Sequence, residues 1–85
     1  MPTTTPAQAR AQLRRHHFAN IHPSITTERV MEAVERELTT LDNPGFCLLC
    51  GGEADGCEPD AQGYECESCG ERAVYGAQEI LIAIA

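Results

Sequence analysis

Four cysteines arranged in two Cys-x-x-Cys pairs constrain this chain more than any other feature of its sequence. The pairs, each followed by a glycine, are Cys47-x-x-Cys50-Gly51 and Cys66-x-x-Cys69-Gly70. Two residues between the cysteines let a tight turn aim both sulfurs at one point, and a glycine permits the positive φ that closes the turn. The 15 residues between the pairs, 51–65, match the spacing of four-cysteine zinc sites. We therefore predict that these four thiolates bind one zinc ion.

A zinc ion held by four cysteines has no open coordination position, so it is structural rather than catalytic. The alternative is a rubredoxin-like iron centre, because the same paired turns hold a one-electron iron. Rubredoxins usually shelter that iron beneath aromatic side chains, and only Phe46, Tyr64 and Tyr75 lie near the cysteines in this sequence. Structural Zn²⁺ is therefore the expected cofactor, with iron as the minor alternative.

The size and composition of the chain also favour a metal. A unit of 85 residues with two phenylalanines, two tyrosines and no tryptophan has too small a core to be stable without a staple. Five cysteines, an odd number, argue against a set of disulfides.

The N-terminal residues lack the apolar stretch of a secretory signal, and residues 80–85 are too few to cross a bilayer. We therefore expect a cytoplasmic protein that does not contact a membrane.

Acidic residues are concentrated in the second part of the chain. Residues 1–27 carry three arginines and no acid, whereas residues 28–85 carry three arginines and 13 acids, which gives +3 and −10 and a net charge of −7. Four thiolates on one divalent ion add about two further negative charges, so the C-terminal half should repel nucleic acid rather than bind it. The acids that we expect to meet a partner protein are Glu58, Asp60, Glu65 and Glu67.

The one basic cluster is Arg14-Arg15-His16-His17, with Arg10 one helical turn earlier. We interpret it as a solvated helix face, because so few charges offer few phosphate contacts. Contact of Arg10, Arg14 and Arg15 with nucleic acid is the alternative. Adjacent residues on a helix point about 100° apart, so His16 and His17 do not share a metal. We expect all three histidines of the chain to be solvated or packing groups.

Two helices are expected before the cysteines. Thr5 followed by Pro6 is a cap with proline at the first helical position, and good helix formers extend over residues 7–19. A second helix should open at Thr26 or Thr27 and end before the Asp-Asn-Pro-Gly turn at 42–45. Its apolar stripe is predicted to pack in the core, with an exposed dimer seam as the alternative. The stripe consists of Val30, Val34, Leu38 and Leu41.

Short strands and tight turns are expected from Phe46 onward. The predicted strands form a three-stranded meander over residues 54–57, 64–66 and 73–75. The last ten residues, 76–85, fit either a helix or a strand, and we favour a short helix because Ala77, Gln78 and Glu79 open it.

The predicted fold class is therefore α+β, with two N-terminal helices followed by a C-terminal zinc ribbon of three short antiparallel strands. One compact unit would comprise three segments. These are an N-terminal arm and first helix (1–25), an amphipathic helix (26–42) and a zinc-ribbon module (43–85).

Cys57 stands outside both pairs. Free cysteine commonly packs as a small hydrophobe, so we predict a buried strand residue. Its acidic neighbours in the sequence would raise the pKa of the thiol and disfavour a nucleophilic role. These neighbours are Glu53, Asp55, Glu58 and Asp60.

Four short motifs in the second half of the chain are typical of a known family. They are Asn-Pro-Gly-Phe-Cys at 43–47, Gly-Cys-Glu-Pro-Asp-Ala at 56–61, Tyr-Glu-Cys at 64–66 and Val-Tyr-Gly-Ala at 74–77. With these motifs the chain resembles small uncharacterised zinc-ribbon proteins of bacterial and phage genomes. The resemblance covers residues 41–81 of the 85. It implies a ribbon fold and a bound zinc ion, and it assigns no activity.

No set of acid, base and nucleophile gathers in the sequence, so we do not expect an enzyme. The leading hypothesis is a non-catalytic zinc-binding module that docks another protein through an acidic surface. A second hypothesis is a phage or mobile-element inhibitor whose acids block a nucleic-acid-binding host or defence complex. A third is nucleic-acid binding through the N-terminal arginines.

Overall fold

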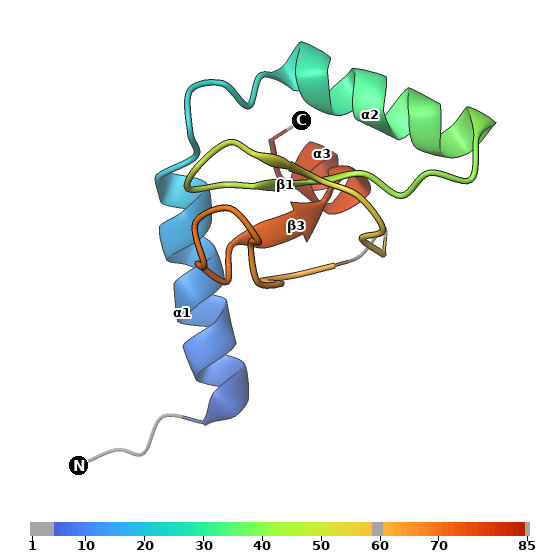
Figure 1. Cartoon of the computed structure of the whole chain (residues 1–85). Helices are drawn as coiled ribbons and strands as arrows, with labels where there is room; N and C mark the ends of the chain where they lie inside the picture. Colours follow the sequence, from blue (N-terminus) through green and yellow to red (C-terminus); the bar gives the residue numbers. More distant parts are fainter. Residues whose placement is uncertain (1–4, 59–60, 85) are drawn as a thin grey trace.

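A computed structural model of the chain describes residues 5–58 and 61–84. Figure 1 shows α2 (Thr27–Thr39) and α3 (Ala77–Ile84) side by side next to the small sheet, whereas the N-terminal end of α1 (Pro6–Ala19) extends past the sheet. The α+β class is confirmed, and a third helix follows the strands. In chain order the elements are α1 (Pro6–Ala19), α2 (Thr27–Thr39), β1 (Gly45–Cys47), β2 (Glu53–Ala54), β3 (Val74–Gly76) and α3 (Ala77–Ile84).

Local caps set where the first two helices begin. The Thr5 hydroxyl accepts a hydrogen bond from the Gln8 N–H at 3.1 Å, and the Gln8 side chain accepts one from the Thr5 N–H at 3.0 Å, which is a capping box. In α2 the hydroxyl of Thr26 accepts from the N–H of Arg29 at 3.2 Å. Both predicted starts are confirmed, because a cap depends only on residues three apart in the sequence.

The prediction that the whole apolar stripe of α2 packs in the core is wrong. Val30 is fully buried and Val34 is half-buried, but Leu38 is 73 % exposed and Leu41 is 99 % exposed. The helix ends at Thr39, so Leu41 lies beyond it. Figure 1 shows the last turn of α2 projecting past α3 and the sheet, and this projection places Leu38 outside the core.

The sheet differs from the predicted meander. Its strand order is β2-β1-β3 with both pairings antiparallel, and the central strand β1 is absent from the predicted set. The predicted strand 54–57 is replaced by β2, and the predicted strand 64–66 is reduced to an isolated bridge between Tyr64 and Val74. The first cysteine pair forms the hairpin turn between β1 and β2, so the residues before this turn become a strand. The turn of the second pair begins at Cys66, so the predicted strand 64–66 cannot extend through it. The short C-terminal helix is confirmed as α3.

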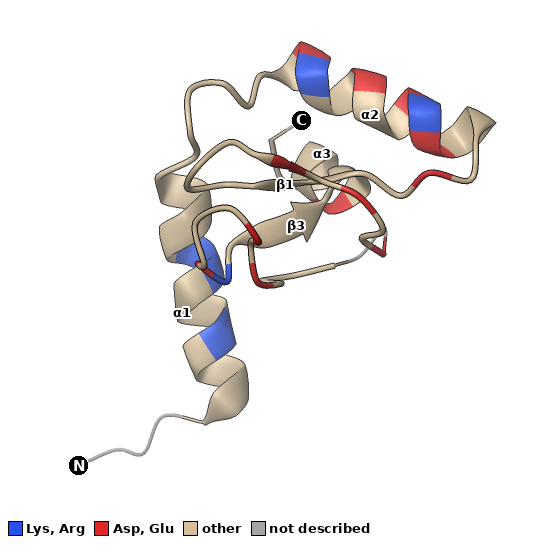
Figure 2. Cartoon of the chain, in the orientation of Figure 1, with Lys and Arg blue, Asp and Glu red and all other residues tan. Residues whose placement is uncertain are grey.

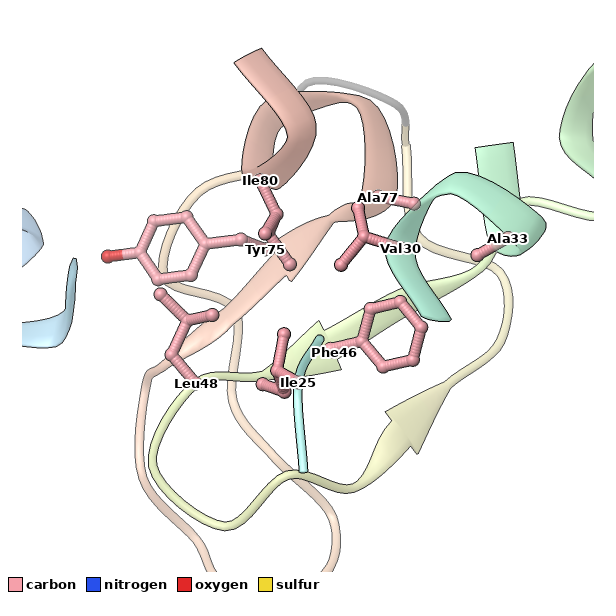
Figure 3. Packing of buried hydrophobic residues seen from close by; sticks show 8 residues of the cluster. All are labelled: Ile25, Val30, Ala33, Phe46, Leu48, Tyr75, Ala77 and Ile80. Atoms are coloured by element: carbon pink, nitrogen blue, oxygen red, sulfur yellow. The ribbon is translucent and has the colours of Figure 1, made fainter. Parts of the chain in front are cut away.

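A small core lies between the sheet and the helices (Figure 3). Phe46 of β1 and Tyr75 of β3 are cross-strand partners, and they are 1 % and 2 % exposed. Burying one side chain of this size stabilises the fold by about 1.5–3 kcal/mol. A core with so few large side chains is small compared with the conformational entropy that is lost when the whole chain is ordered. The other buried members are Ile25, Val30, Ala33, Leu48, Ala77 and Ile80.

The last turns of α1 attach this helix to the core. The Phe18 ring packs edge-on against Tyr75 with 5.1 Å between the ring centroids. His17 Nδ1 lies 2.8 Å from the Tyr75 hydroxyl, within hydrogen-bond distance. The last turn of α1 is therefore anchored by the contacts of His17 and Phe18 with Tyr75 of β3.

The solvated-face interpretation of the basic cluster is only partly correct. Arg15 and His16 are exposed as expected, but His17 is 2 % exposed. Arg14 Nη2 donates to the Glu79 carboxylate of α3 at 2.8 Å. The cluster lies at the contact between α1 and the rest of the chain, where His17 is buried and Arg14 forms an ion pair.

Candidate metal centre

The structure brings the sulfurs of Cys47, Cys50, Cys66 and Cys69 together, all within 4.8 Å of one another. The Sγ atoms of Cys47 and Cys69 are 3.7 Å apart, and those of Cys50 and Cys66 are 3.6 Å apart. A Zn–S bond of about 2.3 Å in a tetrahedron requires sulfur–sulfur distances of about 3.8 Å. The four thiols therefore fit a single ion of this size.

The two cysteine pairs form the same backbone turn, which we call the first cysteine turn (residues 47–52) and the second cysteine turn (residues 66–71). The Gly51 N–H donates to the Cys47 carbonyl at 2.8 Å, and the Gly70 N–H donates to the Cys66 carbonyl at 2.8 Å. Gly51 and Gly70 have φ of +77° and +79°. The requirement for glycine after each pair is thus confirmed.

Backbone N–H groups inside these turns point at the sulfurs. The Gly52 N–H donates to Cys50 Sγ at 3.4 Å. Hydrogen bonds from the N–H groups of Cys69 and Ser68 lower the pKa of the Cys66 thiol to about 7. Burial has the opposite effect on Cys47 and raises the pKa of its thiol to about 12. Metal binding at neutral pH must therefore displace a proton from Cys47, and the turns supply donors that stabilise the thiolates.

One side of the sulfur cluster is closed by the protein. Cys47 and Cys66 are buried among small apolar side chains, Cys50 is half-buried, and Cys69 is exposed. Among residues 5–58 and 61–84, no other group of three or more His, Cys, Asp or Glu side chains gathers closely enough to hold a metal. An ion bound here would have four sulfur ligands, and the residues that the structure describes offer no fifth.

The loop between α1 and α2 packs against the first cysteine turn, a contact that the sequence does not predict. The His22 N–H donates to the Leu48 carbonyl at 2.7 Å. Arg29 Nη1 donates to the Gly51 carbonyl at 2.9 Å, and the same guanidinium lies 4.7 Å from the centre of the Phe46 ring. No local pattern marks these residues, because their partners are more than 15 positions away. The candidate metal centre is thereby tied to α2 and to the loop that precedes it.

Cys57 lies outside the four-sulfur cluster. It is 6 % exposed, as expected for a packing residue, but it is not part of a strand. Burial raises the pKa of its thiol, and the charge of Asp55 raises it further. A Cβ placed on Gly45 would lie 2.9 Å from Cys57 Sγ, so this sulfur occupies the space that a glycine leaves in β1.

The acids expected to meet a partner are only partly brought together. Glu65 and Glu67 line a cavity of about 340 Å³ beside Cys66, together with Glu53 and Asp55, which were not in the predicted set. Glu58 accepts a hydrogen bond from the Tyr64 hydroxyl at 3.4 Å. Asp60 lies outside the described residues.

The N-terminal arginines are likewise separated by the fold. Arg10 and Arg14 line one cavity at the base of α1, and Arg15 does not contribute to it. Arg14 is also engaged by Glu79. The three arginines therefore do not present one common surface.

Comparison of the chain with protein-family models, curated proteins and solved structures finds no match. In the described part of the chain, none of the helices has the length and apolar character needed to span a bilayer.

Proposed function

We propose that Cys47, Cys50, Cys66 and Cys69 bind one structural Zn²⁺ ion and that residues 43–85 are a zinc ribbon. The observation that carries this proposal is the meeting of four sulfurs from two matching turns, all within 4.8 Å of one another. Two of the distances, 3.7 Å and 3.6 Å, are close to the roughly 3.8 Å of a zinc tetrahedron. When bound, the ion crosslinks the two turns. The resemblance to zinc-ribbon proteins of bacterial and phage genomes agrees with this proposal and stays a prediction.

Zinc is preferred over iron because the sulfurs lack an aromatic cover. Phe46 and Tyr75 pack in the core cluster between the sheet and the helices, whereas Cys47 and Cys66 belong to the other buried cluster, with alanine and valine. Tyr64 is 45 % exposed. Two of the three rings thus pack in the other cluster and the third is exposed, which differs from the aromatic cover that is typical of a rubredoxin-like iron.

We further propose that the chain acts as a non-catalytic module that docks another protein through an acidic surface. Four sulfur ligands leave a zinc ion no position for water or substrate, which supports a structural role. The cavity beside Cys66 carries Glu53, Asp55, Glu65 and Glu67, of which Glu53 is already paired with Arg36. Figure 2 shows acidic segments spread over α2 and the loops of the ribbon. A basic segment of a partner fits the charge of the ribbon acids around this cavity.

The test is affinity capture with the zinc-loaded chain, followed by titration of the captured protein. A double variant, Glu65→Gln with Glu67→Gln, removes two charges from the cavity. The matched control, Glu28→Gln with Glu32→Gln, removes two charges from the exposed face of α2. We expect the first variant to weaken binding about tenfold or more and the control to change it less than about twofold. A partner that binds both variants equally contradicts docking through the ribbon acids.

A further inference from the structure

A cavity of about 170 Å³ is lined by residues of α1 and of the loop that precedes β3. Three of the six arginines of the chain line it, namely Arg10, Arg14 and Arg72. Gln62 also lines the cavity, with its side-chain amide donating to the Glu79 carboxylate at 3.0 Å, and Leu13 and Tyr75 supply apolar surface. In a protein with a net charge of −7, half of the cationic side chains thus border one small cavity.

Tertiary contacts build this cavity from segments far apart in the sequence. Arg10, Leu13 and Arg14 are three and four residues apart, so they share the face of α1 that also carries His17. That face is docked by the contact of His17 with Tyr75. On the other wall, the bridge between Tyr64 and Val74 holds residues 62–63 next to Arg72.

Two of the three arginines at the cavity have no acidic partner in the described part of the chain. Arg14 is neutralised by Glu79 at 2.8 Å. Within residues 5–58 and 61–84, neither Arg10 nor Arg72 has an ion pair or a side-chain hydrogen bond. Neither Glu71 nor Glu79 lines the cavity. Two guanidinium groups with no acidic partner among the described residues are therefore available to a bound anion.

We propose that this cavity binds the terminal phosphate monoester of a small molecule. Such a group carries a charge close to −2 at neutral pH because its second pKa is about 6, which matches the two unpaired arginines. Guanidinium groups bind phosphate oxygens in a planar, bidentate geometry. The cavity is smaller than the roughly 300–1,000 Å³ of pockets that enclose a whole ligand. It therefore takes the phosphate and the atoms next to it, which contact Leu13 and Tyr75.

The test is calorimetric titration of the full zinc-loaded chain with phenyl phosphate, a dianion with an apolar body. Arg10→Gln and Arg72→Gln are each expected to weaken binding about tenfold, the effect of losing one charged hydrogen bond. Arg15→Gln is the matched control, because Arg15 is on the same helix and exposed but does not line the cavity. It should change the affinity less than about twofold. Dimethyl phosphate, a monoanion, should bind at least about tenfold more weakly than phenyl phosphate.

Several results would overturn the proposal. These are no saturable binding of phenyl phosphate, equal binding of dimethyl phosphate, or an equal loss in the Arg15→Gln variant. Binding of an oligonucleotide without a terminal phosphate, with the same arginine dependence, would assign the cavity to nucleic acid instead. Amide chemical shifts of Gln62 and Gly63 give a second readout, and they should move on addition of phenyl phosphate. The inference is independent of the proposed docking function, since Glu65→Gln with Glu67→Gln should leave phenyl phosphate binding unchanged.

Discussion

The two glycines that close the cysteine turns have the same backbone conformation in different surroundings. Their φ angles are +77° at Gly51 and +79° at Gly70. A Cβ on Gly51 would lie 2.3 Å from Ser24 Oγ and 2.8 Å from His22 Nδ1, whereas a Cβ on Gly70 would meet nothing within 4 Å. Gly51 is therefore required by the backbone and by packing, and Gly70 by the backbone alone.

Alanine substitutions at these two positions separate the two effects. Gly70→Ala is expected to lower the free energy of unfolding by about 1–2 kcal/mol, the strain of a left-handed residue with a side chain. Gly51→Ala is expected to lower it by about 3 kcal/mol or more, because Ser24 and His22 must also move. Urea unfolding of the zinc-loaded variants measures both values. Equal losses would show that the loop before α2 does not press on the first cysteine turn.

The buried His17 makes the stability of the chain depend on pH. Burial, with a contribution from the charge of His16, lowers the pKa of His17 below its ordinary value of 6.5. The fold thus favours the neutral ring, whose stabilising effect is complete above the unfolded pKa and is lost as the pH falls through 6.5 and below.

The comparison is between the natural chain and His17→Gln. Between about pH 8 and about pH 5, the free energy of unfolding should fall more steeply in the natural chain, because glutamine does not titrate. The sulfur site is common to both proteins, so its own pH dependence cancels in the difference. Parallel profiles would exclude a role for His17 in this pH dependence.

At the scale of elements, α2 is held against the ribbon by two arginines in different settings. Arg29 donates to the Gly51 carbonyl and covers the Phe46 ring, and it is half-buried. Arg36 pairs with Glu53 on the surface. The first contact is shielded from water, whereas the second is screened by it.

These two arginines should therefore differ in their effect on stability. Arg29→Gln is expected to lower the free energy of unfolding by about 1.5–3 kcal/mol, the range for a hydrogen bond to a charged group. Arg36→Gln should change it little, because exposed ion pairs contribute little in water. Thermal or urea unfolding of the zinc-loaded variants measures the difference. A larger loss for Arg36→Gln would contradict this account of how α2 is attached.

At the scale of the whole molecule, folding is expected to depend on the metal. Cys47→Ser should abolish zinc binding and cooperative unfolding, since a structural zinc site contributes on the order of 10 kcal/mol in small domains. Cys57→Ala is the control, because this thiol is buried but lies outside the four-sulfur cluster. It should retain one zinc ion per chain and lose about 1–2 kcal/mol. Elemental analysis and circular dichroism with and without a chelator check both variants, and a metal-free chain that stays folded would overturn the zinc proposal.

The separation of charge between α1 and the rest of the chain bears on nucleic-acid binding. In Figure 2, α1 carries basic segments and no acidic ones, whereas α2 and the ribbon loops carry the acids. We expect no retention of the zinc-loaded chain on heparin at about 0.15 M salt, because the acids of the ribbon oppose the few arginines. Retention that falls steeply with salt and is lost in Arg10→Gln and Arg15→Gln would instead support nucleic-acid binding.

The sequence by itself determined what depends on neighbours along the chain. The two cysteine turns, their glycines and the starts of α1 and α2 follow from residues that are two to four positions apart. The tertiary structure alone decided which segments meet. It made β1 the central strand, left Leu38 outside the core and placed Arg72 opposite α1. Backbone turns and helix caps are short-range interactions, so the residues that form them can be recognised from the local sequence. Burial and strand pairing depend on contacts between segments that are far apart in the sequence, and no local pattern shows which segments will meet.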